Sequence, residues 1–183
     1  MENASKALLI AGGVLIAILV MTLGIYFSRM IADHSARVYS QLEESRRTEF
    51  NQKFLNYDIN HRDEKDGSSN IDLTIQDIVT IVNLAKNSNE YNQLENVTPP
   101  ADPTNDKSLY VTVNCTRVSY GKLYGLPDSE KKNLEKLDEE RLNSILTDEL
   151  KGMPQDDNNR IKYSCTVNVN QNTGYVNYIE ITN

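Results

Sequence analysis

Residues 7–28 read ALLIAGGVLIAILVMTLGIYFS, a run of 22 positions without a charged side chain. As a helix, this run is about 33 Å long, enough to cross a hydrocarbon core of about 30 Å. The apolar region of a cleaved signal peptide is usually about 7 to 15 residues long and is followed by a small-residue cleavage site, which is missing here. The segment therefore predicts a retained transmembrane anchor over residues 1–28, with the lipid bilayer as its first partner.

One side of the predicted anchor carries small residues. Gly13, Ala17 and Gly24, together with Val20, lie on the same side of a helical wheel. Such a stripe allows a second helix to approach closely in lipid, which predicts self-association or packing against another membrane protein. The alternative is that Gly and Ala are simply common in membrane helices.

The anchor is expected to continue as a helical stalk over residues 29–57, because no Pro or Gly interrupts this stretch. Apolar residues recur near helical spacing on either side of a polar stretch at residues 43–49. They are Ile31, Val38, Leu42, Phe50, Phe54 and Tyr57. The alternative is a membrane helix followed by a separate amphipathic helix.

Residues 58–183 then predict one small α+β domain. A helix is expected over residues 73–86, with Thr74 as its cap and Asp77 completing a capping box. Residues 87–106 contain three prolines and predict a loop. A further helical stretch is expected between Leu126 and Leu150.

Strands are indicated by alternation of apolar and polar residues. They are expected over residues 109–118, 161–169 and 175–182, with the last two joined as a hairpin around residues 171–174. The predicted fold class is α+β: a long N-terminal membrane-spanning helix followed by a small antiparallel sheet packed on helices.

Two cysteines, Cys115 and Cys165, are the only ones in the sequence, and both fall on the apolar sides of predicted strands. They predict a disulfide, which would indicate an oxidising compartment. The alternative is a pair of buried thiols that act as small apolar side chains.

The rest of the composition argues against several classes of function. A net charge of −7 without a basic cluster disfavours nucleic-acid binding. His34 and His61 are the only histidines, which leaves little with which to build a zinc site or a Ser-His-Asp arrangement. We therefore expect a protein that is not an enzyme and needs no metal or other cofactor.

Two features of the sequence disagree about orientation. Arg29, Arg37, Arg46 and Arg47 follow the anchor, whereas only Lys6 and the terminal amine precede it, which favours a cytoplasmic domain. However, long domains translocate largely regardless of charge, and the cysteine placement favours an oxidising compartment. We expect a single-pass protein of the cell membrane with its domain outside the cell.

The overall plan resembles that of type IV pilins and pseudopilins: a short leader, an apolar helix that continues as a stalk, and a small α+β domain with two late cysteines. It is also similar to uncharacterised signal-anchored proteins of Gram-positive bacteria. Residues 5–11, SKALLIA, lack the Gly and Glu of the pilin processing motif. The resemblance implies a membrane-anchored structural or assembly subunit; the alternative is a monomeric anchored binding or accessory module of a cell-surface or secretion system.

Overall fold

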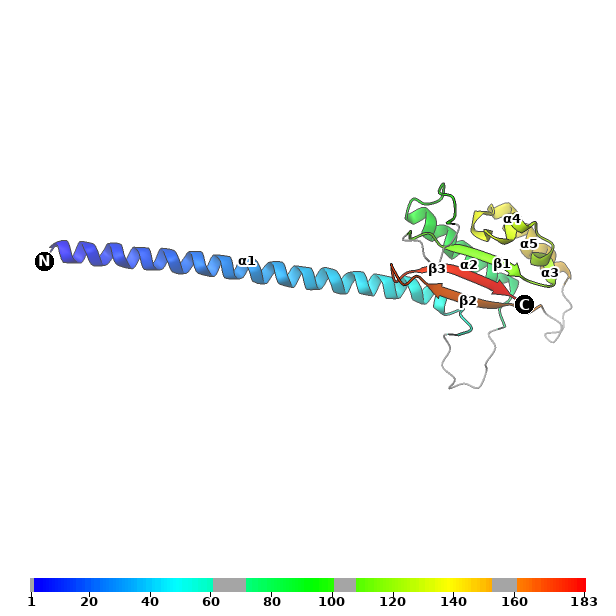
Figure 1. Cartoon of the computed structure of the whole chain (residues 1–183), viewed down its shortest axis with the longest axis horizontal. Helices are drawn as coiled ribbons and strands as arrows, with labels where there is room; N and C mark the ends of the chain where they lie inside the picture. Colours follow the sequence, from blue (N-terminus) through cyan, green and yellow to red (C-terminus); the bar gives the residue numbers. More distant parts are fainter. Residues whose placement is uncertain (1, 61–71, 101–107, 153–160) are drawn as a thin grey trace. The chain divides into compact units, whose positions relative to one another are not determined.

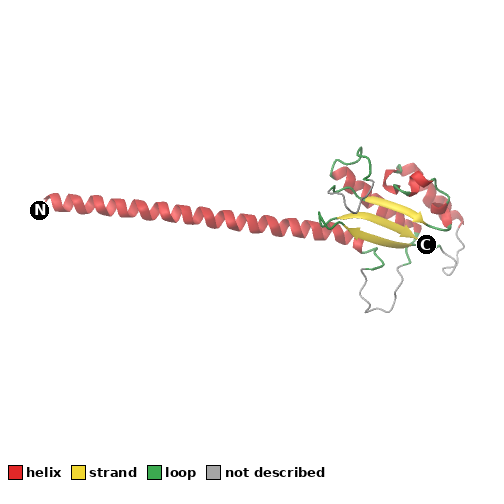
Figure 2. Ribbon diagram, in the orientation of Figure 1, coloured by secondary structure: helices red, strands yellow, loops and turns green. Residues whose placement is uncertain are grey.

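The computed structural model describes residues 2–60, 72–100, 108–152 and 161–183 (Figure 1). The chain divides into two compact units, Met1–Arg46 and Arg47–Asn183. The described elements are α1 (Glu2–Leu55), α2 (Ile75–Tyr91), β1 (Thr112–Arg117), α3 (Gly121–Tyr124), α4 (Asp128–Lys131), η2 (Leu134–Lys136), α5 (Glu139–Gly152), β2 (Ser164–Val169) and β3 (Val176–Thr182). The fold class is therefore α+β, with a long N-terminal apolar helix (Figure 2).

Helix α1 is continuous for 54 residues, so the apolar segment and the polar one after it belong to a single helix. Two separate helices, the alternative left open by the sequence, are not present. Its last nine residues, 47–55, belong to the second compact unit. The division into an anchor over residues 1–28, a stalk over 29–57 and a domain over 58–183 remains a prediction.

The predicted capping box at the start of α2 is confirmed. The Thr74 hydroxyl accepts a hydrogen bond from the Asp77 N–H at 3.4 Å, and the Asp77 carboxylate accepts one from the Thr74 N–H at 2.8 Å. The predicted end at residue 86 is wrong, because α2 continues to Tyr91. Its last turn is held by Asn89, a buried residue that forms two hydrogen bonds with the backbone of Val111.

The three strands form one sheet in the order β1-β3-β2. Strands β2 and β3 are antiparallel and form the predicted hairpin. In its turn, Gly174 donates its N–H to the Asn170 carbonyl at 2.8 Å and has a φ of 73°, which glycine adopts without strain.

The prediction of a wholly antiparallel sheet is wrong, because β1 and β3 are parallel. β3 lies between the other two strands, so the last strand of the hairpin pairs with β1. Alternation along a strand identifies its buried face but not its neighbour, and a parallel partner requires a long crossover. The connection from β1 to β3 covers residues 118–175 and includes β2.

One hydrophobic core contains buried residues from α2 and all three strands, together with residues between β1 and β2. Among its members are Ile75, Ile78, Ile81, Val82, Val111, Val113, Leu134, Leu142, Ile145, Val167, Ile179 and Ile181. Along the strand predicted over residues 109–118, the expected polar side is also buried at Tyr110 and Thr112, which the alternation did not predict.

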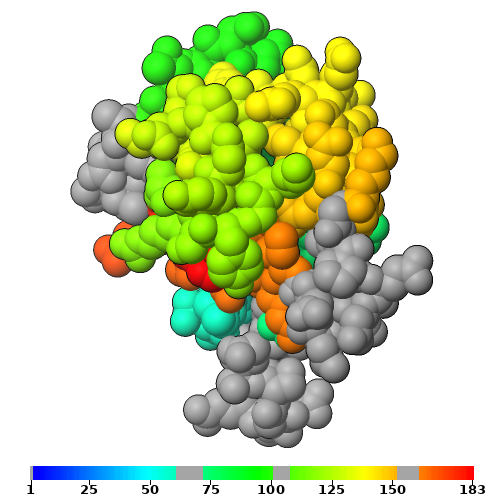
Figure 3. Space-filling view, turned by 90° about the vertical axis from the view of Figure 1, so that its right-hand side faces the viewer, coloured from blue at the N-terminus to red at the C-terminus, as the bar shows by residue number. Residues whose placement is uncertain are grey.

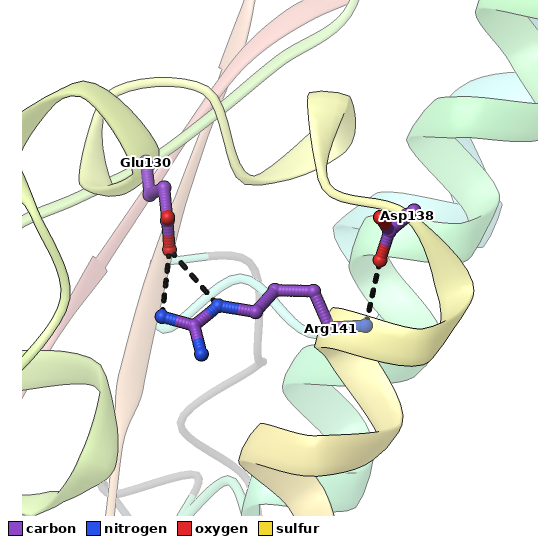
Figure 4. Close-up of polar contacts among 3 residues, drawn as sticks. All are labelled: Glu130, Asp138 and Arg141. Carbon is purple, nitrogen blue, oxygen red and sulfur yellow. Dashed lines mark hydrogen bonds and ion pairs between the residues drawn. The ribbon is translucent and has the colours of Figure 1, made fainter.

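The helical stretch expected between Leu126 and Leu150 is divided into α4, η2 and α5. Asp138 caps the N-terminus of α5. Its carboxylate accepts a hydrogen bond from the Arg141 N–H at 2.7 Å, as an N-cap residue does (Figure 4). The Arg141 guanidinium donates two hydrogen bonds to the Glu130 carboxylate, both at 3.3 Å. This contact joins α5 to α4 across the break.

Candidate functional site

The N-terminal part of α1 carries most of the exposed apolar surface. Within the described residues, α1 is the one helix long and apolar enough to cross a membrane, and no residue of its most apolar window is buried. Its large exposed apolar side chains run from Leu8 to Leu42. Exposed apolar surface of this extent is typical of a segment that contacts lipid or another protein. The helix is therefore compatible with a single-pass membrane anchor.

The predicted packing residues Gly13, Ala17, Val20 and Gly24 all lie on α1 and are exposed. A Cβ atom added to Gly13 or Gly24 would meet no atom within 4 Å. Larger side chains would therefore fit within this chain, and any requirement for small residues at these positions would come from a neighbouring helix.

The same side of α1 remains apolar beyond the predicted span. Ala17, Gly24, Ile31 and Val38 follow one another at intervals of seven residues. Seven residues return to nearly the same side of a straight helix, with a drift of about 20°. Ile31, Val38 and Leu42 are 66%, 46% and 45% exposed. We call Gly13, Ala17, Val20, Gly24, Ile31, Val38 and Leu42 the α1 stripe.

The last turns of α1 contact the β2–β3 hairpin. The Asn51 side chain donates to the Gly174 carbonyl at 2.8 Å and accepts from the Val176 N–H at 2.9 Å. The rings of Phe50 and Tyr175 meet edge to face, with 5.4 Å between their centroids. These contacts lie within the second compact unit and fix residues 47–55 to the hairpin.

Both cysteines are buried and are free thiols in the structure. Cys115 is on β1 and Cys165 on β2, with β3 between them. Two inter-strand spacings amount to about 10 Å, whereas the Cα atoms of a disulfide are at most about 7 Å apart. Burial raises the pKa of each thiol to about 12. This placement favours the alternative of two buried thiols that act as small apolar side chains.

Side chains and loop backbone cover both edges of the sheet. Just before β1, the Val111 N–H donates to Asn89 Oδ1 at 2.8 Å, and on β1 the Val113 N–H donates to Glu135 Oε2 at 2.9 Å. On β2, the Val167 N–H donates to Asp58 Oδ1 at 3.3 Å. The Cys165 carbonyl accepts from the Ile59 N–H at 2.9 Å. Covered edges of this kind hinder the addition of a further strand.

Two buried glutamates each bind a buried tyrosine. Tyr110 donates its hydroxyl to Glu135 at 3.1 Å, and Tyr163 donates its hydroxyl to Glu149 at 2.7 Å. Burial, followed by the nearby glutamate, raises the pKa of both tyrosines above their usual range. Both hydroxyls therefore stay protonated, and each donates to its glutamate when that carboxyl is ionised.

The Glu149 pair also shapes the turn before α3. The Lys122 N–H donates to Glu149 Oε2 at 2.9 Å, and Gly121 beside it has a φ of 85°. A Cβ atom on Gly121 would lie 2.6 Å from the Tyr163 hydroxyl oxygen. Only glycine fits this position without strain.

None of these groups forms a recognisable catalytic or metal centre. Among the described residues, no group of three or more His, Cys, Asp and Glu side chains could hold a metal ion. His34 lies on α1, and His61 falls outside the described residues.

Sequence reasoning missed the buried roles of Asn89, Glu135 and Glu149. Each lies in a polar stretch, and nothing in the local pattern separates it from the solvated charges and amides around it. Their partners are between 14 and 27 residues away along the chain, so only the tertiary fold identifies them.

No protein-family model matches the chain, and neither a curated protein nor a solved structure matches it.

Proposed function

We propose that this chain is a single-pass, membrane-anchored structural or assembly subunit, similar in plan to pilins, whose copies associate through α1. The observation that carries the proposal is the α1 stripe, in which small residues within the apolar segment are in phase with exposed aliphatic residues beyond it. If the anchor contacted only lipid, nothing would require the apolar side of the helix to continue in register into the polar segment.

The way in which the chain inserts into the membrane supports a second copy of the same chain as the source of the helix that packs against the α1 stripe. Copies of one chain insert with the same orientation, so their helices run parallel when they meet. In a parallel pair, equivalent residues lie opposite each other across a two-fold axis. Gly13 and Gly24 would then meet small residues in lipid, while Ile31, Val38 and Leu42 would bury one another in water.

The covered edges of the sheet also support association through the helix. A pilus-like assembly could in principle grow by strand addition, which requires an open edge. In the described residues, Asn89, Glu135 and Asp58 occupy backbone donors on both edges. Strand addition would have to displace these buried side chains.

The alternative is a monomeric anchored module that binds a partner at the cell surface. It is favoured by residues 5–11, which lack the glycine and glutamate of the pilin processing motif. The two functions differ in self-association. We expect the full-length chain, solubilised in mild detergent, to have the molar mass of a dimer or larger oligomer by light scattering. A monomer over the accessible concentration range would support the anchored module instead.

We further propose that the domain is extracytoplasmic. Two sequence motifs in the domain allow this orientation to be tested. Asn96-Val97-Thr98 and Asn114-Cys115-Thr116 match the acceptor pattern for N-glycosylation. Translation with eukaryotic microsomes should add glycan if the domain enters the lumen, and the double variant Asn96→Gln with Asn114→Gln should lose the mass shift. An unmodified wild-type chain that sediments with the microsomes would place the domain on the cytoplasmic side.

A further inference from the structure

The edge of β1 that faces away from β3 is covered by two side chains of different chemistry. Asn89 of α2 pairs with Val111 through two hydrogen bonds, at 2.8 and 2.9 Å, and its amide does not titrate. Glu135 of η2 accepts the Val113 N–H at 2.9 Å and the Tyr110 hydroxyl at 3.1 Å, and its carboxyl does titrate. The Asn89 contacts with Val111 are therefore independent of pH, whereas the Glu135 contacts can change with pH.

The surroundings of Glu135 keep its carboxyl away from water. The residue is 3% exposed, although it lies in a short turn that is rich in charge. Lys136 is the cation whose charge acts on the carboxyl, but its ammonium donates to the carbonyls of Glu95 and Val97. The cation is thus held by other acceptors rather than by Glu135.

Several charged groups on the elements packed against η2 also have partners of their own. From α2, the Lys86 ammonium donates to the Leu137 carbonyl at 3.2 Å. From α4, Lys131 pairs with Asp128 at 3.9 Å and Glu130 pairs with Arg141. From β1, Arg117 pairs with Glu180 at 3.2 Å. The group on the β1 side that faces Glu135 is the neutral Tyr110 hydroxyl.

We propose that Glu135 is a proton-controlled lock on the free edge of β1, closed most firmly when its carboxyl is protonated. In the protonated form, Oε2 accepts the Val113 N–H and the acid O–H can donate to the Tyr110 oxygen. In the ionised form, both oxygens accept. In the protonated form the Tyr110 hydroxyl no longer donates to Glu135, whereas the ionised form leaves a charge buried without a paired cation, which is the larger cost.

The direction of the pH effect follows from burial. Burial, opposed by the hydrogen bonds and by Lys136, raises the pKa of the Glu135 carboxyl from 4.5 to about 7. When η2 separates from β1, the carboxyl meets water and ionises with its ordinary pKa. Between these two pKa values the closed form binds more protons than the open form, so closure weakens as the pH rises toward 7 and is then constant.

The experiment is hydrogen exchange, followed by mass spectrometry, on the full-length chain in detergent between pH 5 and 8. Protection of the peptide that contains Val113, corrected for intrinsic exchange, should fall by up to about tenfold per pH unit between about pH 5 and 7 and then level off. The Glu135→Gln variant should show no such slope, because an amide can donate to Tyr110 and accept from Val113 without titrating.

Glu149→Gln is the matched control, since it makes the same change at the other Tyr–Glu pair, and it should keep the wild-type slope at Val113. An equal slope in Glu135→Gln, or no slope in the wild-type chain, would overturn the proposal. If Glu135→Gln does not fold, the carboxyl carbon of Glu135 can be titrated by NMR in the wild-type chain. A midpoint near 4.5 would also overturn it.

Discussion

The hydroxyl of Tyr163 donates to the carboxylate of Glu149 at 2.7 Å, and both residues are buried. The bond joins the last turns of α5 to the residue that precedes β2, 14 positions later in the sequence. The second carboxylate oxygen accepts the Lys122 N–H, so α3 is tied to the same point. One carboxylate thus holds together three segments of the chain.

Removal of the Tyr163 hydroxyl should therefore destabilise the domain. In Tyr163→Phe, Glu149 stays buried but loses its closest donor, and we expect a loss of about 1 to 3 kcal/mol in the free energy of unfolding. Tyr178→Phe is the control, because that hydroxyl accepts from Asn114 at a half-buried position. Urea titration followed by circular dichroism measures both. If both variants lost the same free energy of unfolding, the contact with Glu149 would stabilise the domain no more than an ordinary half-buried hydrogen bond.

Two glycines close to this site make a matched pair for a backbone test. Gly121→Ala should cost at least about 1 to 2 kcal/mol, because alanine is strained at a φ of 85° and its Cβ would lie 2.6 Å from the Tyr163 oxygen. Gly125→Ala should be tolerated, because Gly125 has a φ of −75° and the nearest atom to its added Cβ is 3.6 Å away. Thermal unfolding of the two variants provides the comparison, and similar melting temperatures would contradict the account.

Cys115 and Cys165 should behave as inert thiols rather than as a redox pair. Each is buried and has a pKa of about 12, so little thiolate is present at neutral pH. We expect both thiols to react with a maleimide in urea and neither to react in the folded chain. An intact mass lower by two hydrogens after purification without reductant would show that they are bonded.

Local signals in the sequence predicted local structure well. Thr74 and Asp77 identified the start of α2 because a capping box involves only four consecutive residues. The hairpin was likewise predictable, since its strands are adjacent in the sequence and Gly174 occupies the turn position that needs a positive φ.

Pairing and burial that depend on distant residues were not predictable in the same way. The parallel pairing of β1 with β3 joins Thr112 to Tyr178, 66 residues away, and the same alternation would suit an antiparallel neighbour. The candidate association residues could be identified from the sequence, because the spacing of Gly13, Ala17 and Gly24 is local. Their exposure together with Ile31 and Val38 on one continuous helix came from the structure.

Crosslinking of α1 variants in membranes tests the central claim, that copies associate through the α1 stripe, most directly. The double variant Gly13→Leu with Ala17→Leu should insert normally but block close approach of a second helix. Ala11→Leu is the control, since it makes the same kind of change about 160° around the helix from Gly13. We predict a crosslinked dimer in the wild-type chain and in Ala11→Leu, and its loss in the double variant. A dimer of equal intensity in all three would contradict the account.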